Sequence, residues 1–287
     1  MKSAVKKAMV GELTIVIGVV LLVVLIIFVG KLNAGFKGQG TDRDICKSSV
    51  STQASVMEVP FGKGLIPTNC KTYNVVFYDN HVEINGKVQP VYDSRENQVV
   101  TRFDSLTNDI VNHVVAEELR GCWYQYLEGK KFILDRKSLL AIFETGQPRL
   151  CVLCDEISFD SSVPDSTFTG FYSYTKTHEV NDRSYTYYSY YAEGPTICTD
   201  YSSKPDFVNC WESYFADQIK SENPSFTPEN TPTFRVGEKY AVVFIMRGVK
   251  PGKKELFSES DVDFFSYVLP ADKLSGQCDT MQRGSVS

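Results

Sequence analysis

An uninterrupted apolar segment near the N-terminus, Leu13 to Val29, constrains this chain more than any other feature of its sequence. The segment contains no charged residue and no proline, and at 1.5 Å per helical residue it spans most of the hydrocarbon core of a bilayer. Neighbouring residues extend it, so a transmembrane helix is expected at residues 13–32. The expected organisation is a short basic cytoplasmic segment (1–12), this helix, a glycine-rich linker (33–45) and an extracytoplasmic domain (46–287).

Two other interpretations of the N-terminus stay open. A cleaved secretory signal fits the basic residues Lys2, Lys6 and Lys7, but the apolar segment is longer than a signal-peptide core and a poor cleavage site follows it. The sequence from Lys6 to Glu12, followed directly by an apolar helix, resembles the leader of type IV pilin-like proteins. That resemblance implies that a peptidase removes the first residues and that Glu12 helps subunits to self-assemble through their N-terminal helices.

All eight cysteines follow the apolar segment: Cys46, Cys70, Cys122, Cys151, Cys154, Cys198, Cys210 and Cys278. An even number of cysteines in a domain tethered by a secretory-type helix predicts four disulfides in an oxidising compartment. The domain is therefore expected outside the cytoplasm and the N-terminus inside, an orientation that the lysines before the helix favour slightly. The sequence does not fix the pairing.

The chain has one CxxC motif, Cys151-Val152-Leu153-Cys154, whereas a zinc ribbon needs two. The motif opens an alternating segment, residues 151–159, that predicts a β-strand. Cysteines three apart in a strand point to opposite faces, so these two are expected to bridge different partners. We expect structural disulfides rather than a metal site, and no cofactor.

The remaining pattern predicts an α+β domain with a mainly antiparallel sheet, two packed helices and disulfide staples. Strands are expected at residues 151–159, 239–246 and 264–269, and the second of these is expected to be central because it is apolar on both faces. A hairpin is expected at residues 72–92, around an Asn85-Gly86 turn.

The stronger helix is expected at residues 106–128, where apolar side chains recur at helical spacing and Gly129 follows as a cap. Cys122 lies on the apolar face and should clamp this helix to the sheet. Glu117, Glu118 and Arg120 are expected to face solvent. A second amphipathic helix is expected at residues 207–219 and a short one at residues 139–144.

Residues 168–201 are unusually rich in tyrosine. We favour an extended hairpin whose tyrosines form cross-strand pairs on a half-buried sheet. The alternative is a recognition face, since tyrosine offers an apolar ring with a polar tip. That candidate binding surface consists of His178, Tyr185, Tyr187, Tyr188, Tyr190 and Tyr191.

The sequence contains no motif that points to catalysis. The three histidines, His81, His113 and His178, lack metal-ligand spacing, and no P-loop, dinucleotide-binding glycine motif or nucleophile elbow is present. A net charge of −5 disfavours nucleic-acid partners. We expect a non-enzymatic binding or structural protein of the cell envelope, with a protein or glycan partner at the cell surface. The alternatives are a pilin-like subunit and an envelope hydrolase that uses His178 with nearby carboxylates.

Five segments around cysteines carry a second resemblance: Cys46–Val50, Asn69–Thr72, Glu118–Lys130, Cys151–Asp160 and the ending from Leu269-Pro270 to Cys278. Together they resemble a group of uncharacterised, single-pass, cysteine-rich surface proteins of small-genome archaea. The resemblance implies an anchored, disulfide-bonded domain and implies no activity.

Overall fold

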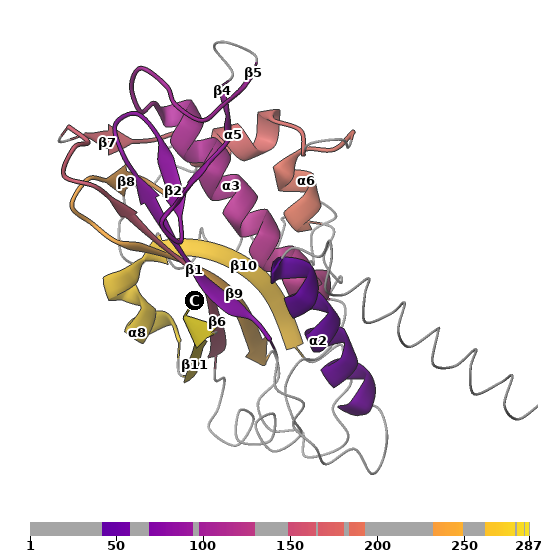
Figure 1. Cartoon of the computed structure of the whole chain (residues 1–287). Helices are drawn as coiled ribbons and strands as arrows, with labels where there is room; N and C mark the ends of the chain where they lie inside the picture. The colour runs from indigo at the N-terminus through magenta and orange to yellow at the C-terminus, as the bar shows by residue number, and fades with distance from the viewer. Residues whose placement is uncertain are drawn as a thin grey trace, which may run out of the picture. The chain divides into compact units, whose positions relative to one another are not determined.

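The structure is a computed structural model that describes residues 42–57, 69–93, 98–129, 149–164, 166–180, 184–192, 232–248, 262–278, 280–283 and 285–286 (Figure 1). The chain divides into two compact units, residues 1–45 and 46–287, and the second contains all the described strands. The apolar segment, the helices expected at residues 139–144 and 207–219, and both Cys198 and Cys210 lie outside the described residues. Among the residues that are described, no helix is long and apolar enough to cross a membrane.

A sheet of eight strands organises the domain, in the order β10-β9-β6-β1-β2-β3, with β11 and β12 added beside β6 and β1. The bounds of these strands are β1 Lys71–Phe77, β2 Val82–Ile84, β3 Lys87–Gln89, β6 Arg149–Phe159, β9 Tyr240–Gly248, β10 Val262–Pro270, β11 Thr280–Arg283 and β12 Ser285–Val286. Two small sheets pair β4 (Val91–Asp93) with β5 (Gln98–Val100), and β7 (Thr167–Phe168) with β8 (Phe234–Arg235). The helices are α2 Asp42–Met57, α3 Asn108–Gln125, η1 Leu127–Gly129, α5 Phe171–Thr177, α6 Tyr187–Ala192, η5 Ala271–Lys273 and α8 Leu274–Gln277.

Strand β9 is buried along its length, from Tyr240 to Met246. It pairs antiparallel with β6 on one side and with β10 on the other, which confirms the central position expected for residues 239–246. The strands expected at residues 151–159 and 264–269 are confirmed as parts of β6 and β10. Antiparallel pairs predominate, although β1 runs parallel to β6, and the fold class is mixed α+β.

The expected turn at Asn85-Gly86 joins β2 to β3. Both residues adopt left-handed conformations, with φ of +53° and +70°, the combination that suits a two-residue hairpin turn. The side-chain oxygen of Asn85 also accepts a hydrogen bond from the backbone N–H of Asn74 in β1, at 2.8 Å. The segment expected as a hairpin, residues 72–92, is therefore a three-stranded meander, because the chain also turns between β1 and β2.

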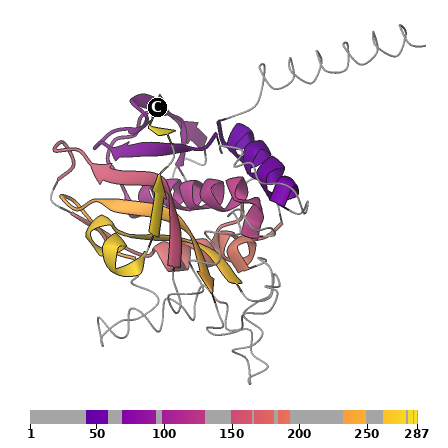
Figure 2. The ribbon, with the colours of Figure 1, turned by 90° about the horizontal axis from the view of Figure 1, so that it is seen from below.

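Helix α3 packs against β9 and β10 (Figure 1, Figure 2). Its N-cap is Thr107, whose hydroxyl accepts a hydrogen bond from the N–H of Ile110. Near its other end, the rings of Trp123 and Tyr126 lie 5.8 and 4.9 Å from the ring of Phe244 in β9, measured between centroids. These aromatic contacts explain why the apolar positions of the expected helix face the sheet.

The end of α3 differs from the expected one. The helix ends at Gln125, and the turn η1 reverses handedness, because Leu127, Glu128 and Gly129 all have positive φ. The expectation that Glu118 faces solvent is wrong, since its side chain is only 7% exposed. Glu118 follows Val115 by three residues and precedes Cys122 by four, so it lies on the same buried face of the helix.

Three disulfides join separate elements of the domain: Cys46–Cys70, Cys122–Cys154 and Cys151–Cys278. The second fixes α3 to β6, which confirms the expected clamp. Cys151 and Cys154 have different partners, as their spacing predicts, and neither offers a free thiol to a metal. The first disulfide ties α2 to the start of β1. Helix α2 begins at Asp42, so the last four residues of the expected linker are helical.

Candidate functional site

The tyrosine-rich segment forms the short helices α5 and α6 rather than the expected extended hairpin (Figure 1). Between them, Glu179 and Thr186 form an antiparallel bridge. Helices of six and seven residues are not stable alone, but both pack on α3 and on each other. Tertiary packing therefore overrides the preference of tyrosine for strands.

Three tyrosines of the candidate binding surface lie inside the domain. Tyr187, Tyr190 and Tyr191 are 1%, 7% and 8% exposed, so they do not form the exposed recognition face that we considered. Tyr185 and Tyr188 are half-buried. The side chain of His178 is 38% exposed. We call the packed tyrosines of α5 and α6 on α3 the tyrosine layer. We call the last three residues, which are partly exposed, its rim.

Hydrogen bonds from the buried hydroxyls attach the tyrosine layer to α3 and η1. Tyr191 donates to the backbone oxygen of Ala116 at 2.8 Å, and Tyr190 donates to the carboxylate of Glu128 at 3.1 Å. Tyr187 donates a short hydrogen bond to the carboxylate of Glu117. Each buried hydroxyl of α6 thus has an acceptor, as burial of a polar group requires.

Glu117 is the charged centre beneath this layer. Besides the Tyr187 hydroxyl, it accepts two hydrogen bonds from the guanidinium of Arg120, at 2.9 and 2.7 Å. Burial alone would raise the pKa of Glu117, but Arg120 and the hydroxyl of Tyr187 together hold this pKa below its usual range. Burial and the charge of Glu117 raise the pKa of Tyr187, which therefore stays protonated and acts as the donor.

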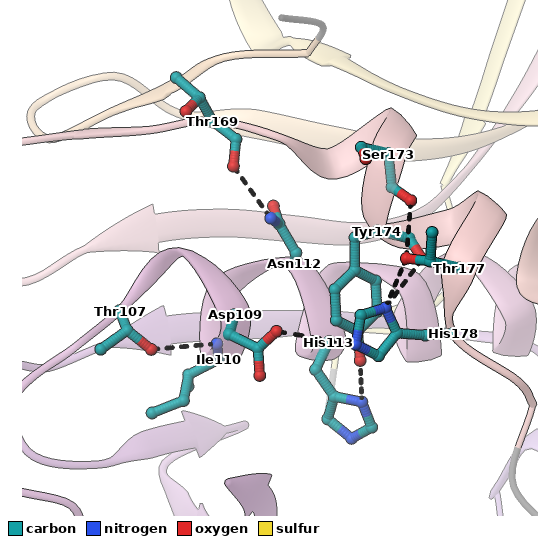
Figure 3. Close-up of polar contacts among 10 residues, drawn as sticks. All are labelled: Thr107, Asp109, Ile110, Asn112, His113, Thr169, Ser173, Tyr174, Thr177 and His178. Carbon is teal, nitrogen blue, oxygen red and sulfur yellow. Dashed lines mark hydrogen bonds and ion pairs between the residues drawn. The ribbon is translucent and has the colours of Figure 1, made fainter. Parts of the chain in front are cut away.

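A second polar group lies where α5 meets the first turns of α3 (Figure 3). Nε2 of His178 is 3.9 Å from the carboxylate of Asp109, and the His178 ring stacks on the Tyr174 ring with centroids 3.8 Å apart. The hydroxyl of Tyr174 lies 3.0 Å from Nδ1 of His113. The other ring nitrogen of His178 contacts the Thr177 hydroxyl at 3.0 Å.

The protonation states within this group follow from burial. Burial lowers the pKa of His113, although the charges of Glu117 and Asp109 act in the opposite direction. Burial also raises the pKa of Tyr174. At neutral pH the phenol is therefore protonated and the imidazole is neutral, so Tyr174 donates and Nδ1 of His113 accepts.

Two asparagines of α3 hold the chain just before α5, and Figure 3 shows one of them, Asn112. The side-chain N–H of Asn112 donates to the backbone oxygen of Thr169 at 2.9 Å, and the side-chain oxygen of Asn108 accepts from the backbone N–H of Thr169 at 2.8 Å. Gly170 follows at a φ of +86°, a conformation that favours glycine, and α5 begins. Both ends of α5 are thus bonded to α3.

Lys176 links the outer parts of the two short helices. Its ammonium lies 4.3 Å from the ring centroid of Tyr172 and 5.0 Å from that of Tyr188. The two rings are nearly perpendicular, with centroids 5.9 Å apart. Such cation–π contacts contribute about 0.5–1 kcal/mol at exposed sites, which favours α5 and α6 remaining together.

In the part of the chain that the structure describes, no three histidine, cysteine or acidic side chains converge as metal ligands. No protein-family model, curated protein or solved structure matches this chain. The resemblances carried by the N-terminus and by the cysteine contexts therefore remain predictions.

Sequence reasoning missed Asp109, His113, Tyr174 and Glu117 as members of the site. One signal was present: Asp109 precedes His113 by four residues, and Tyr174 precedes His178 by four, a spacing that brings side chains together along a helix. The two pairs meet only in the fold, since 61 residues separate His113 from Tyr174.

Proposed function

We propose that this chain is a membrane-anchored protein of the cell envelope whose extracytoplasmic domain binds a partner or supports structure without catalysing a reaction. The observation that carries the proposal is the set of three disulfides, which join α2 to β1, α3 to β6, and β6 to the C-terminal segment. Structural disulfides persist in oxidising compartments and are rare in the cytosol. The apolar segment Leu13–Val29 supplies a membrane anchor that would deliver the domain to such a compartment.

The tyrosine layer supports a binding role more than a catalytic one. Its buried hydroxyls donate to acceptors on α3 and η1, so they fix the positions of α5 and α6. The half-buried rings of Tyr185 and Tyr188 belong to its rim, where Tyr185 stacks on Tyr190 and Tyr188 contacts Tyr172. We assign the contact with a protein or glycan partner to this rim, because an immobilised tyrosine offers an apolar face and a polar tip at little entropic cost.

The compartment is tested on the full-length chain extracted from its native membrane. The intact mass is measured after alkylation in denaturant, with and without prior reduction. We expect the six cysteines of the three described disulfides to be alkylated only after reduction, on a chain that keeps residues 1–12. Alkylation of these cysteines without reduction would contradict the proposal. A mass lacking the residues before Met9 or Glu12 would instead support the pilin-like subunit.

The partner contact is tested separately, by replacing Tyr185 and Tyr188 with serine. This double replacement should weaken binding of the domain to a glycan array or to native envelope extract at least tenfold, while the urea unfolding midpoint falls much less than in a variant of the buried Tyr187. The matched change is Tyr187→Ser, which should unfold the domain because that side chain is buried. Unchanged retention in the Tyr185→Ser/Tyr188→Ser variant would remove the rim as the contact.

One contact favours an envelope hydrolase as a second candidate. His178 and Asp109 lie 3.9 Å apart and are 38% and 31% exposed, so a carboxylate and an imidazole meet within reach of solvent. This is the pairing that general-base catalysis uses. Wild-type turnover of ester or glycoside probes that His178→Ala abolishes, at unchanged thermal stability, would support it. A wild-type chain that hydrolyses neither probe class would exclude both of these chemistries.

A further inference from the structure

Asp109, His178, Tyr174 and His113 form a continuous chain of contacts between α3 and α5 (Figure 3). Asp109 and His113 lie one turn apart on α3. Tyr174 lies in α5, and His178 is the residue that caps its C-terminus. The four side chains therefore attach the C-terminal half of α5 to α3, as the Asn108 and Asn112 contacts attach its start.

His113 is the buried member of this group, at 8% exposure. The titratable and charged groups that face it come from α3 itself, from α5 and from β4: Asp109, Glu117, Arg120, Tyr174, His178 and Tyr92. The two carboxylates favour a proton on His113, whereas burial and the cationic forms of Arg120 and His178 oppose it. Burial is the largest of these effects, so the pKa of His113 lies below its ordinary value.

The lowered pKa of buried His113 sets the direction in which acid acts on the contact between α5 and α3. When α5 leaves α3, His113 becomes exposed and takes up a proton near pH 6.5, the value of an unperturbed histidine. Below that pH the detached form binds more protons than the attached form, so acid favours detachment. Because one proton is involved, the equilibrium constant for detachment rises by up to tenfold for each pH unit.

We propose that these four side chains form an acid-sensitive latch, which holds α5 on α3 at neutral pH and releases it when His113 takes up a proton. The rest of the domain stays folded, because the Cys122–Cys154 disulfide and the packing of Trp123 on Phe244 keep α3 on the sheet. Release therefore exposes the tyrosine-bearing face of α5 and the first turns of α3. The latch does not depend on the identity of any partner.

His178 adjusts the latch in the opposite direction. It is charged only when protonated, and it then forms an ion pair with Asp109 that tightens the contact of α5 with α3.

Hydrogen exchange of the full-length chain in lipid nanodiscs tests the latch. The amides of α5 are followed at pH 7.5, 6.5 and 5.5, with each rate corrected for the intrinsic effect of pH. We expect the opening constant of α5 to rise less than twofold between pH 7.5 and 6.5, and by up to about fivefold between pH 6.5 and 5.5. The amides of β9 should stay protected throughout. Protection of α5 that does not depend on pH, or equal loss of protection in β9, would overturn the latch.

The variant that isolates the latch is His113→Asn, in which an amide replaces the titrating ring near the Tyr174 hydroxyl. Its α5 opening should no longer rise on acidification. His81→Asn, at the turn between β1 and β2, is the matched control and should keep the wild-type response. A rise of α5 opening at acid pH that survives in His113→Asn would overturn the proposal.

If His113→Asn fails to fold at pH 7.5, the histidine NMR signals of the wild-type chain decide the question. The chain has only three histidines, and His81→Asn and His178→Asn assign two of them. Because the attached form binds the proton less readily, its His113 signal should titrate below pH 6.5, at the lower end of the range in which α5 opening rises. A His113 signal that titrates at or above pH 6.5 would overturn the latch.

Discussion

Glu117 keeps a negative charge beneath a covering helix, and it does so through two neighbours. Arg120 approaches from the same helix, and the hydroxyl of Tyr187 approaches from α6. Hydrogen bonds to a charged group contribute about 1.5–3 kcal/mol each to stability. The domain loses much of this free energy when a buried charge loses one of its donors. The position of α6 therefore depends strongly on one hydroxyl.

Replacing Tyr187 with phenylalanine should lower the free energy of unfolding by about 1.5–3 kcal/mol. The ring and its packing remain, but the carboxylate of Glu117 loses a donor. Urea denaturation of the full-length chain in detergent micelles measures the effect. In a double-mutant cycle with Glu117→Gln, the two losses should not add, because both act on one hydrogen bond. Additive losses would show that the two side chains stabilise the domain independently.

At the scale of elements, the start of α3 illustrates how a cap positions a site. Thr107 bonds to the N–H of Ile110, and the next residues in the chain, Asn108 and Asp109, contact the start and the end of α5. A frayed first turn would therefore displace both attachments. The cap of this one helix is linked to the stability of another.

The Thr107→Ala variant should lose about 1 kcal/mol of stability because an N–H of the first turn loses its acceptor. Thr107→Ser keeps the hydroxyl and should stay within a few tenths of a kcal/mol of the wild type. Thermal unfolding of the two variants measures the change in stability. Hydrogen exchange of the α5 amides measures whether the attachment of α5 to α3 is weakened. Equal stabilities of the alanine and serine variants would mean that the cap does not contribute.

The strands were predictable from sequence because β6, β9 and β10 carry long apolar segments that suit a buried sheet. The tyrosine-rich segment was not, since tyrosine favours strands when no partner is considered. Its helical character was nevertheless visible in one pattern: Tyr187, Tyr190 and Tyr191 are spaced at i, i+3 and i+4, and all three are buried. The spacing of the buried side chains was a better guide than their residue type.

The candidate site was harder to predict for a physical reason. Glu118 and Glu117 carry charges, and a charged residue on a helix is normally solvated. Here Tyr187 of α6 covers Glu117 and Arg120 compensates its charge, whereas Glu118 shares the buried face of Val115 and Cys122. The sequence contains the charges, but only the fold shows which of them are covered.

At the scale of the whole molecule, the disulfides should differ in the stability that they supply. Cys151 and Cys278 are 127 residues apart, whereas Cys46 and Cys70 are 24 apart. The loop-entropy relation gives about 5 kcal/mol for the first and about 3.5 kcal/mol for the second. The longer loop restricts the unfolded chain more.

The double replacement Cys151→Ala/Cys278→Ala should therefore destabilise the domain more than Cys46→Ala/Cys70→Ala does. Urea unfolding of both variants, with the remaining cysteines oxidised, measures the difference. The reverse order would show that local packing around the sulfurs outweighs the restriction of the unfolded chain.

The Cys46–Cys70 disulfide also has a mechanical consequence. Tension applied to the chain ahead of Cys46 passes through the sulfur–sulfur bond to residue 70 and enters β1 directly. The intervening segment, which would extend by about 80 Å if it were pulled straight, bears no load. The load instead acts along β1, as shear against the ladders that join it to β2 and β6, where several hydrogen bonds must break together. A domain tethered at its N-terminus would in this way resist pulling as a stiff body, and chemical reduction of one bond would turn it into an extensible one.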